Sequence, residues 1–178
     1  MIALSPTPVL ETERLRLRAP QGDDWPHWHA FHETDRALMI GGGPDQAPGQ
    51  SWRAFGHVIG HWAMRGFGMF VFTRKDDPQP LGMTGPWFPD GRPEREIGWS
   101  VWSPGAEGNG YAFEAATAAR RHAFDSLGWD TAVSYIRTGN ARSIALAERL
   151  GATLDDTAAK PDGIADCLIY RHPKEAAA

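Results

Sequence analysis

The segment from residue 96 to residue 116 constrains the fold of this chain more than any other. It reads Glu-Ile-Gly-Trp-Ser-Val-Trp, then a turn that contains Gly108 and Gly110, and then an alanine-rich run from Tyr111 onwards. This order predicts a strand, a glycine turn and a helix. Glycine lets the backbone approach a ligand closely, and the free amides of a first helical turn attract anions. The segment therefore predicts a binding site for a pyrophosphate.

Small side chains continue through the predicted helix. Four of them share one stripe, which favours close packing on a sheet: Ala112, Ala116, Ala119 and Ala123. Two other phosphate motifs are excluded. A dinucleotide fingerprint starting at Gly108 needs glycine or alanine where Phe113 stands, and no glycine run leads into Lys-Ser or Lys-Thr. The residues alone leave open a plain strand-to-helix turn that uses glycine only for its geometry.

The hydrophobic pattern predicts alternating blocks of strands and helices along the rest of the chain. Helices are expected at 23–34, 51–65, 111–127 and 140–150. Strands are expected at 15–18, 68–74, 81–87, 95–102, 131–137 and 164–171, with a weak one near 152–154. The strands between 68 and 102 are joined by short turns, which indicates an antiparallel meander. A flexible loop is expected at 41–49, and a frayed tail after Pro173.

Length, charge and cysteine content limit the class of protein. A chain of 178 residues suits one domain. The net charge of −4 argues against nucleic acid as a partner, because binding to a phosphate backbone needs a basic surface. The single cysteine, Cys167, excludes an internal disulfide and a cysteine metal site. No apolar run is long enough for a membrane span, and residues 1–9 lack a signal-peptide pattern. We therefore expect a cytoplasmic protein without a membrane partner.

Four segments carry motifs in a fixed order. Residues 10–18 read Leu-Glu-Thr-Glu-Arg-Leu-Arg-Leu-Arg, and residues 107–112 read Glu-Gly-Asn-Gly-Tyr-Ala. Residues 114–116 are Glu-Ala-Ala, and residues 140–152 read Asn-Ala-Arg-Ser-Ile-Ala-Leu-Ala-Glu-Arg-Leu-Gly-Ala. Together they resemble the GNAT superfamily of N-acetyltransferases, closest to its RimJ/RimL-like branch. Gly110 and Ala112 match the small positions of the family's pyrophosphate motif, Arg/Gln-x-x-Gly-x-Gly/Ala.

The resemblance covers about residues 10–171 and implies a single GNAT acetyltransferase domain, 1–178. It implies a mixed α+β fold in which a twisted, mostly antiparallel sheet of about six or seven strands is flanked by about four helices. The two central strands, expected at 95–102 and 131–137, part in a V shape, and acetyl-CoA lies in the opening. The family also suggests a homodimer and no metal.

The resemblance assigns cofactor contacts to three segments. The peptide-like pantetheine arm pairs with backbone groups as an added strand would. By position those groups belong to Ser100, Val101 and Trp102. The residues that wrap the pyrophosphate are Gly108, Asn109, Gly110, Tyr111 and Ala112. From the last helix, Asn140 bonds an amide of the arm and Arg142 bonds a phosphate.

This chain departs from the family pattern in three places. Glu107 stands where arginine or glutamine is usual, and Asn109 replaces a frequent basic residue. A carboxylate beside a pyrophosphate is unfavourable unless it points away, but the backbone amides are unaffected, so we expect binding to survive. The tyrosine that many relatives carry on the last helix falls at Ala147, which removes the usual proton donor to the departing thiolate.

The reaction implied is acyl transfer from a thioester to an amine. A primary amine has a pKa of about 10.4 and must lose a proton before it attacks. Glu96 stands where many GNAT enzymes keep a general base, acting directly or through water. A backbone N–H near Val101 would polarise the thioester carbonyl, and Ser143 would help the thiolate leave. The residues alone also allow Glu96 to be a solvated or ion-paired residue, with Arg95 or Arg137 as partner, and Ser143 to be only a first-turn residue.

Other side chains have simpler interpretations. Cys167 is expected to be a small buried side chain. His57 and His61 are four residues apart, but no carboxylate accompanies them at metal-site spacing, so packing or solvent exposure is favoured. Six aromatic residues are candidates for an acceptor pocket, of which one or two are expected to contact substrate: Trp25, Trp28, Trp62, Trp87, Phe88 and Trp99.

The acceptor amine is expected to be a protein N-terminus or a small molecule. The helices at 23–34 and 51–65 and the loop at 41–49 are expected to shape its site. Two other functions stay open at this point. One is a non-catalytic acyl-CoA-binding sensor, which needs only the pyrophosphate turn. The other is a mononucleotide-binding domain, which predicts a fully parallel sheet.

Overall fold

The computed structural model describes residues 6–163 and 166–174. These residues form one eight-stranded sheet in the order β1-β2-β3-β4-β5-β6-β8-β7. The strands are β1 (Leu10–Glu11), β2 (Leu15–Arg18), β3 (Phe70–Arg74), β4 (Pro80–Trp87), β5 (Glu96–Val101), β6 (Ala132–Arg137), β7 (Thr153–Leu154) and β8 (Cys167–His172). The helices are α1 (Trp25–His32), α2 (Gln50–Arg65), α3 (Tyr111–Asp125) and α4 (Ala141–Arg149). Short 3₁₀ segments are η1 (Gly22–Asp24), η2 (Asp35–Ile40) and η3 (Pro104–Ala106).

The predicted helices and strands are present, with small shifts at their ends. The sheet has one strand more than expected, because β1 pairs back onto β2 across a turn in which Thr12 Oγ1 accepts the N–H of Leu15 at 3.0 Å. The hydrophobic pattern of the sequence did not predict η2 or η3. The expected start of the last strand at Ile164, the end of the expected tail at 175–178 and the first residues of the chain, 1–5, lie outside the described residues.

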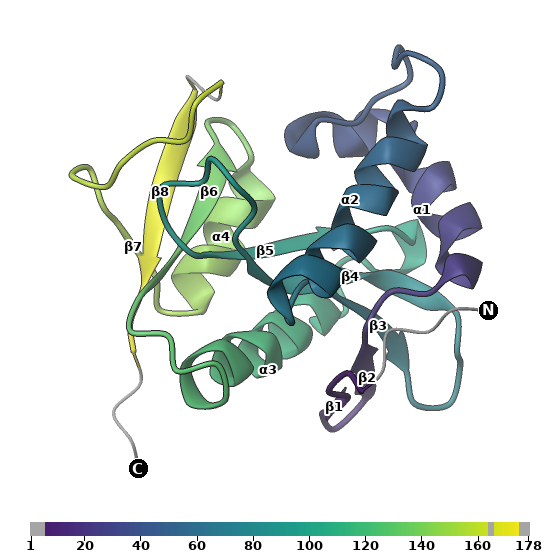
Figure 1. The fold of residues 1–178 in the computed structure, drawn as a ribbon, viewed down its shortest axis with the longest axis horizontal. Coiled ribbons are helices and arrows are strands. Elements are labelled where there is room, and N and C mark those ends of the chain that lie inside the picture. Colours follow the sequence, from purple (N-terminus) through teal and green to yellow (C-terminus); the bar gives the residue numbers. More distant parts are fainter. Residues whose placement is uncertain (1–5, 164–165, 175–178) are drawn as a thin grey trace.

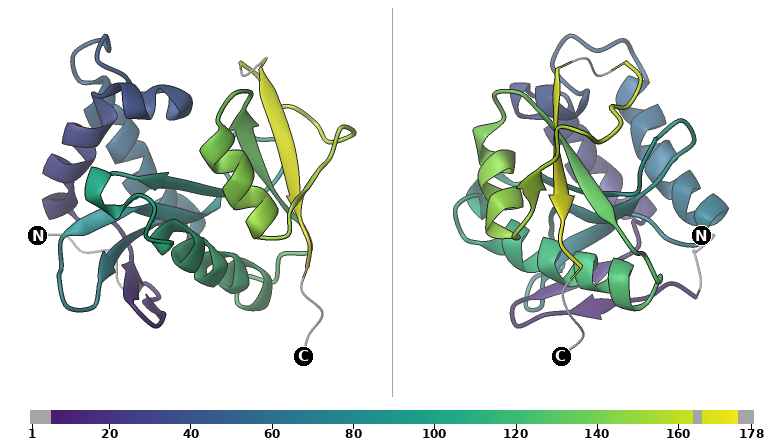
Figure 2. Two further views of the ribbon diagram at one scale, coloured as in Figure 1. Left: turned by 180° about the vertical axis from the view of Figure 1, so that it is seen from behind. Right: turned by 90° about the vertical axis from the view of Figure 1, so that its left-hand side faces the viewer.

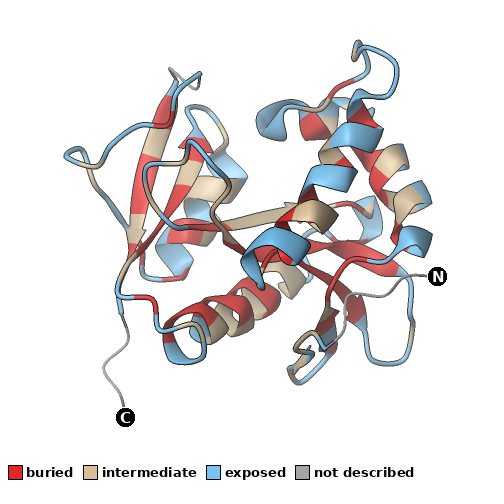
Figure 3. Ribbon diagram, viewed as in Figure 1, coloured by how far each residue is buried: buried red, intermediate tan, exposed pale blue. Residues whose placement is uncertain are grey.

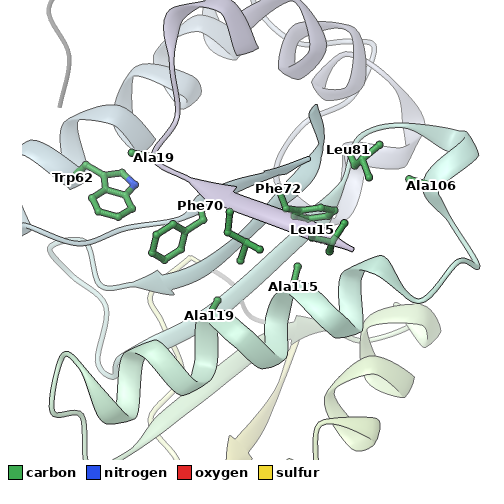
Figure 4. Packing of buried hydrophobic residues seen from close by; sticks show 10 residues of the cluster. Leu15, Ala19, Trp62, Phe70, Phe72, Leu81, Ala106, Ala115 and Ala119 are labelled. Atoms are coloured by element: carbon green, nitrogen blue, oxygen red, sulfur yellow. The ribbon is translucent and has the colours of Figure 1, made fainter. Parts of the chain in front are cut away.

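Alternating side chains of the sheet face two different layers of helix. From β3, Phe70 and Phe72 pack with Leu15, Ala115 and Ala119 on the side covered by α3, as Figure 4 shows. Between them, Val71 faces the opposite side, since successive strand residues point to opposite faces. Both faces of β3 are buried, and Figure 3 shows the buried residues gathered in the sheet and in the helix faces that cover it.

The second layer is formed by α1 and α2, which are packed against the sheet through Trp28, Phe55 and Val58. Figure 1 shows these two helices on one side of the molecule and α3 on the other. Among the described residues, no helix combines the length and apolar character that crossing a lipid bilayer requires.

The sheet opens between β5 and β6. Every other pair of neighbouring strands in the described chain is antiparallel, whereas β5 and β6 are parallel and share a single bridge, Glu96 with Val133. Beyond that bridge, β5 continues along β4 and β6 continues along β8. Figure 2 shows α1 and α2 on one side and α4, β6 and β8 on the other, diverging above β5. A fully parallel mononucleotide fold is therefore ruled out, and the predicted V-shaped split is present.

The close packing of β4 makes a testable prediction about Gly82. A Cβ at this position would overlap the carbonyl oxygen of Ser100 and lie 2.6 Å from the ring of Phe72. We expect Gly82→Ala to lower the free energy of unfolding by about 2 kcal/mol, because a buried clash forces backbone shifts. Urea unfolding measures this. The matched control is Gly56→Ala in α2, where a Cβ meets nothing within 4 Å. It should gain about 0.5–1 kcal/mol, and equal stability of the two variants would contradict the packing.

Candidate active site

The turn between β5 and α3 presents a row of free main-chain amides. Gly108 and Gly110 both have a φ of +76°, which glycine adopts without strain. Within the described chain, the N–H groups of residues 108–113 have no hydrogen-bond partner, and the first paired amide of α3 is that of Glu114, which donates to Gly110 O at 3.1 Å. Free amides at a helix N-terminus form an anion site.

Glu114 and Arg14 hold this turn from behind. One oxygen of Glu114 accepts the Thr12 hydroxyl at 2.5 Å and the Arg14 N–H at 2.9 Å. The other oxygen accepts Arg14 Nε at 2.7 Å. The same guanidinium donates to Asn109 O at 3.1 Å. The first residue of the Glu-Ala-Ala motif therefore ties the start of α3 to the chain just before β2, and this contact fixes the direction of the amides.

Glu107 does not stand as an isolated carboxylate. Its Oε1 accepts Arg36 Nη2 at 2.6 Å, and its Oε2 accepts Arg142 Nη1 at 2.6 Å. Three charges from η2, the turn and α4 thus form a chain with one net positive charge, which we call the arginine clamp (Arg36, Glu107 and Arg142). The sequence analysis did not identify Arg36. A carboxylate at Glu107 needs a positive partner, but the sequence does not show which of the 18 basic residues provides it.

Arg36 also reaches the end of β5. Its guanidinium donates to Val101 O at 2.8 Å and to Trp102 O at 2.6 Å. The N–H of Trp102 donates to Leu81 O at 2.8 Å. Both backbone groups of Trp102 are therefore already bonded, which corrects the expectation that Trp102 is free to pair with a ligand. Since backbone groups alternate between the two edges of a strand, those of Val101 face the opening.

A cavity of about 610 Å³ lies along these elements, and we call it the outer groove. It brings together most of the predicted cofactor residues: Ser100, Val101, Gly108, Gly110, Tyr111, Ala112, Asn140 and Arg142. The predicted catalytic residue Ser143 also lines it. Asn109 does not line it. Its side chain turns back into the loop and donates to Gly105 O and Glu107 O at 2.9 and 3.1 Å.

The start of α4 supplies two polar groups at the inner end of the groove. Asn140 is the N-cap, and its Oδ1 accepts the N–H of Ser143 at 3.2 Å. The Nδ2 of Asn140 has no partner in the described residues and is available as a donor. Trp99 reaches across from β5, and its Nε1 donates to Ser143 Oγ at 3.2 Å. Because that oxygen accepts a bond, the Ser143 hydroxyl keeps its own proton to donate.

A second cavity of about 590 Å³, the inner pocket, adjoins the groove at Trp99, Ser100, Asn140 and Ser143. Its walls are mainly apolar. They come from α1, α2, β4 and the residue just before β3, and include Trp28, Val58, Met69, Met83 and Trp87. Of the six aromatic candidates, Trp28, Trp87 and Trp99 line this pocket. Trp62 instead belongs to the core, where its Nε1 donates to Met69 O at 2.9 Å.

Glu96 lies in the wall of the inner pocket, at the point where β5 and β6 part. Burial raises the pKa of its carboxyl from 4.5 to about 7, and the nearby Arg92 guanidinium opposes that shift. Its Oε2 is buried without a hydrogen-bond partner in the described chain and lies 3.7 Å from Arg92 Nε. The sequence suggested Arg95 or Arg137 as an ion-pair partner. The residue that faces Glu96 is Arg92, because the 89–92 turn brings it back over the start of β5.

A buried network closes the base of the opening. Ser134 Oγ, on β6, donates to Ile97 O of β5 at 2.6 Å. Since the hydroxyl gives its proton to that carbonyl, His172 Nε2, 2.8 Å away, is the donor to Ser134 Oγ. Burial lowers the pKa of His172 to about 3, with the Arg120 charge acting in the same direction. His172 is thus neutral, and it links β8 to the two strands that diverge. Neither residue carried a signal in the sequence.

The remaining candidates have structural contacts. His61 Nδ1 donates to Phe67 O at 2.9 Å, and its Nε2 accepts the N–H of Phe88 at 3.0 Å, so both ring nitrogens are used within the fold. No group of three or more potential metal-binding side chains gathers in the part of the chain that the structure describes. Cys167 is buried on β8, as predicted, and burial raises the pKa of its thiol.

Comparisons with known proteins point to one family. The family model described as an acetyltransferase (GNAT) domain matches residues 14–153. The crystal structure of an acetyltransferase from Agrobacterium tumefaciens is 37% identical, with 94% of this chain and 95% of that chain covered and a TM-score of 0.85. A GNAT-family acetyltransferase from Bordetella pertussis is 27% identical, with 93% and 99% covered and a TM-score of 0.75. A comparison with curated protein sequences finds no significant match.

A more distant structure shares the fold. RimL, a ribosomal alpha-N-protein acetyltransferase solved in complex with coenzyme A, is 17% identical, with 93% of this chain and 97% of that chain covered and a TM-score of 0.67.

Burial of Glu96 makes a prediction about stability and pH. A carboxyl whose pKa is raised by folding favours the folded state when protonated. The penalty is therefore absent below pH 4.5 and grows until about pH 7, where it approaches about 3 kcal/mol. We expect Glu96→Gln to stabilise the protein relative to wild type by an amount that widens over this pH range, as measured by urea unfolding at several pH values. The exposed control Glu148→Gln should show no widening. A constant difference for Glu96→Gln would contradict the burial.

Proposed function

This chain belongs to the acetyltransferase (GNAT) domain family and is an N-acetyltransferase, and on that premise we propose that it transfers the acetyl group of acetyl-CoA to a primary amine by direct attack in a ternary complex. The amine is a protein N-terminus or a small molecule. The ordered motifs at 10–18, 107–112, 114–116 and 140–152 support a place near the RimJ/RimL-like branch.

The outer groove fits the cosubstrate. Free amides at 108–113 suit a pyrophosphate at the start of α3. The unpaired Nδ2 of Asn140 suits a carbonyl of the pantetheine arm, and Val101 faces the same opening. The arginine clamp supplies the positive charge that the family's usual residue at position 107 would bring. Arg36 must release the Val101 carbonyl for the arm to pair there, so cosubstrate binding rearranges the clamp.

The inner pocket fits the chemistry. An ionised Glu96 takes a proton from the acceptor ammonium, directly or through water, and the amine nitrogen then forms a bond to the acetyl carbonyl carbon. The Val101 N–H stabilises the negative charge on the carbonyl oxygen. The carbon–sulfur bond breaks, the Ser143 hydroxyl passes its proton to the departing sulfur, and the second amine proton restores the Ser143 hydroxyl through solvent. The products are an acetylated amine and CoA, so no covalent acyl-enzyme is needed.

The row of unpaired amides beside a buried carboxylate is the observation that carries this proposal. A non-catalytic sensor needs only the amides. A sensor function does not explain why Glu96 is buried in the wall of a cavity next to the groove. It also does not explain why Glu96 Oε2 has no hydrogen-bond partner among the described residues.

The proposed role of Glu96 is tested by turnover. Wild-type protein, acetyl-CoA and a library of small amines and peptides are incubated, and acetylated products are identified by mass spectrometry. With the best acceptor, kcat/KM should rise with pH through about 7, because Glu96 must be ionised. Glu96→Gln should lose this inflection and about 10²–10⁴-fold in kcat. An unchanged pH profile would exclude Glu96 as the base, and CoA binding without turnover on any amine would favour the sensor.

The arginine clamp makes a separate prediction about affinity. Glu107 places a negative charge beside the expected pyrophosphate and holds two guanidiniums that could otherwise pair with phosphate. We expect Glu107→Gln to lower the Kd for CoA about threefold to tenfold, consistent with about 1 kcal/mol for a charge near a partly exposed site. Calorimetry measures the Kd, and Glu148→Gln is the control of equal charge change on α4. Weaker binding by Glu107→Gln would instead mean that Glu107 orients the guanidiniums toward the phosphates.

A further inference from the structure

The inner pocket holds two oppositely charged side chains, Glu96 and Arg92, that form a loose ion pair and have no hydrogen bond to another group among the described residues. Arg92 Nε lies 3.7 Å from Glu96 Oε2, which is too long for a hydrogen bond. Among the described residues, no acceptor bonds the Arg92 guanidinium, whose one ring contact is with Tyr135 at 5.4 Å. Glu96 Oε2 likewise has no donor. Both side chains line the same cavity, so the pocket offers one anionic and one cationic group side by side.

This pattern is the complement of one simple ligand class. In a free α-amino acid the ammonium and the carboxylate sit on one carbon, with about 2.5 Å between the nitrogen and the carboxyl carbon. An ammonium placed on Glu96 therefore brings its own carboxylate next to Arg92. Guanidinium and carboxylate form strong paired hydrogen bonds, and this pairing would satisfy donors that the folded chain leaves open.

We propose that the acceptor is a free α-amino acid with an apolar side chain, with its ammonium on Glu96, its carboxylate on Arg92 and its side chain against Trp28, Met83 and Trp87. The proposal rests on the proposed acetyl transfer and narrows its substrate. The apolar walls select the side chain, since burying a charged one there without a partner is unfavourable. The cavity volume of about 590 Å³ accommodates an aromatic amino acid beside the acetyl end of the cosubstrate.

The charge balance of the pocket separates this class from other amines. Its carboxylates are Asp90 and Glu96, and its guanidiniums are Arg92 and Arg137. A polyamine carries several positive charges and is favoured by an excess of acid, which these residues do not provide. A peptide N-terminus carries a neutral amide at the position next to Arg92, where a carboxylate would form an ion pair. A zwitterion of zero net charge matches a balanced pair.

The same arrangement accounts for substrate binding and for product release. The α-ammonium passes one proton to Glu96, the nitrogen bonds to the acetyl carbon, and the carbon–sulfur bond breaks. Ser143 protonates the departing sulfur, and the second amine proton restores the Ser143 hydroxyl through solvent, so that CoA leaves as the thiol. The product is an N-acetyl amino acid, whose amide has no positive charge. It keeps the contact with Arg92 but loses the ion pair with Glu96, which favours product release.

The experiment compares three acceptors with the same benzyl group and a primary amine: phenylalanine, phenylalaninamide and phenethylamine. Because the pKa of the amine differs among them, kcat/KM is expressed per unprotonated amine. Wild type should show a kcat/KM for phenylalanine about tenfold to hundredfold above the other two, the range for a hydrogen-bonded charged group. Because Arg92 also lowers the pKa of Glu96, the quantity compared is the ratio of kcat/KM for phenylalanine to kcat/KM for phenethylamine, and Arg92→Met should lower this ratio about tenfold to hundredfold. An effect of Arg92 on Glu96 alone would lower all three equally. The matched control is Arg95→Met, because Arg95 is exposed, stacks on Trp129 and lies outside the pocket, and it should retain the wild-type ranking.

Several results would overturn the proposal while leaving acetyl transfer intact. These are equal wild-type kcat/KM for the three acceptors, a better rate with spermidine or with a peptide, or an equal loss on all three in Arg92→Met. CoA binding with no acetylation of any amine would overturn the proposed function and this inference together.

Discussion

The site depends on how β5 and β6 meet once and then separate. A single parallel bridge joins Glu96 to Val133, and the Ser134 hydroxyl ties β6 to Ile97 O directly beyond it. The neutral His172 secures this point from β8. Each strand then follows its own antiparallel neighbour, so the backbone edges that face each other beyond the bridge are left for a ligand.

The same junction places a carboxylate where folding alone would not keep one. Glu96 is buried, and burial raises its pKa because it disfavours the charged form. Under the proposed function this cost has a use, because a general base needs a pKa near the working pH. Arg92 limits the shift without forming a hydrogen bond, so the carboxylate keeps both its reactivity and its access to the cavity. Stability and function therefore act in opposite directions at this residue.

The positive charge of the outer groove comes from residues far apart in the sequence and not from the glycine-turn motif. The family motif usually carries its positive charge at the position of Glu107. Here the charge comes from Arg36 on η2 and Arg142 on α4, which meet on that carboxylate. Arg36 also covers the Val101 and Trp102 carbonyls. Arg36 thus joins η2 to the end of β5 and to the turn before α3.

The sequence by itself determined the order and type of the helices and strands, the antiparallel meander and the glycine turn, because local periodicity and backbone freedom govern these features. It also identified Asn140 and Ser143 as candidates through a motif, and Glu96 through its position on the strand that leads to the glycine turn. It did not reveal Arg36, Arg92, Ser134 or His172, and it misjudged the backbone of Trp102. The hydrogen bonds of these residues join segments up to 71 residues apart, as between Arg36 and Glu107. Only the tertiary structure decides which side chains meet across the opening, since burial and pairing depend on neighbours that no local pattern specifies.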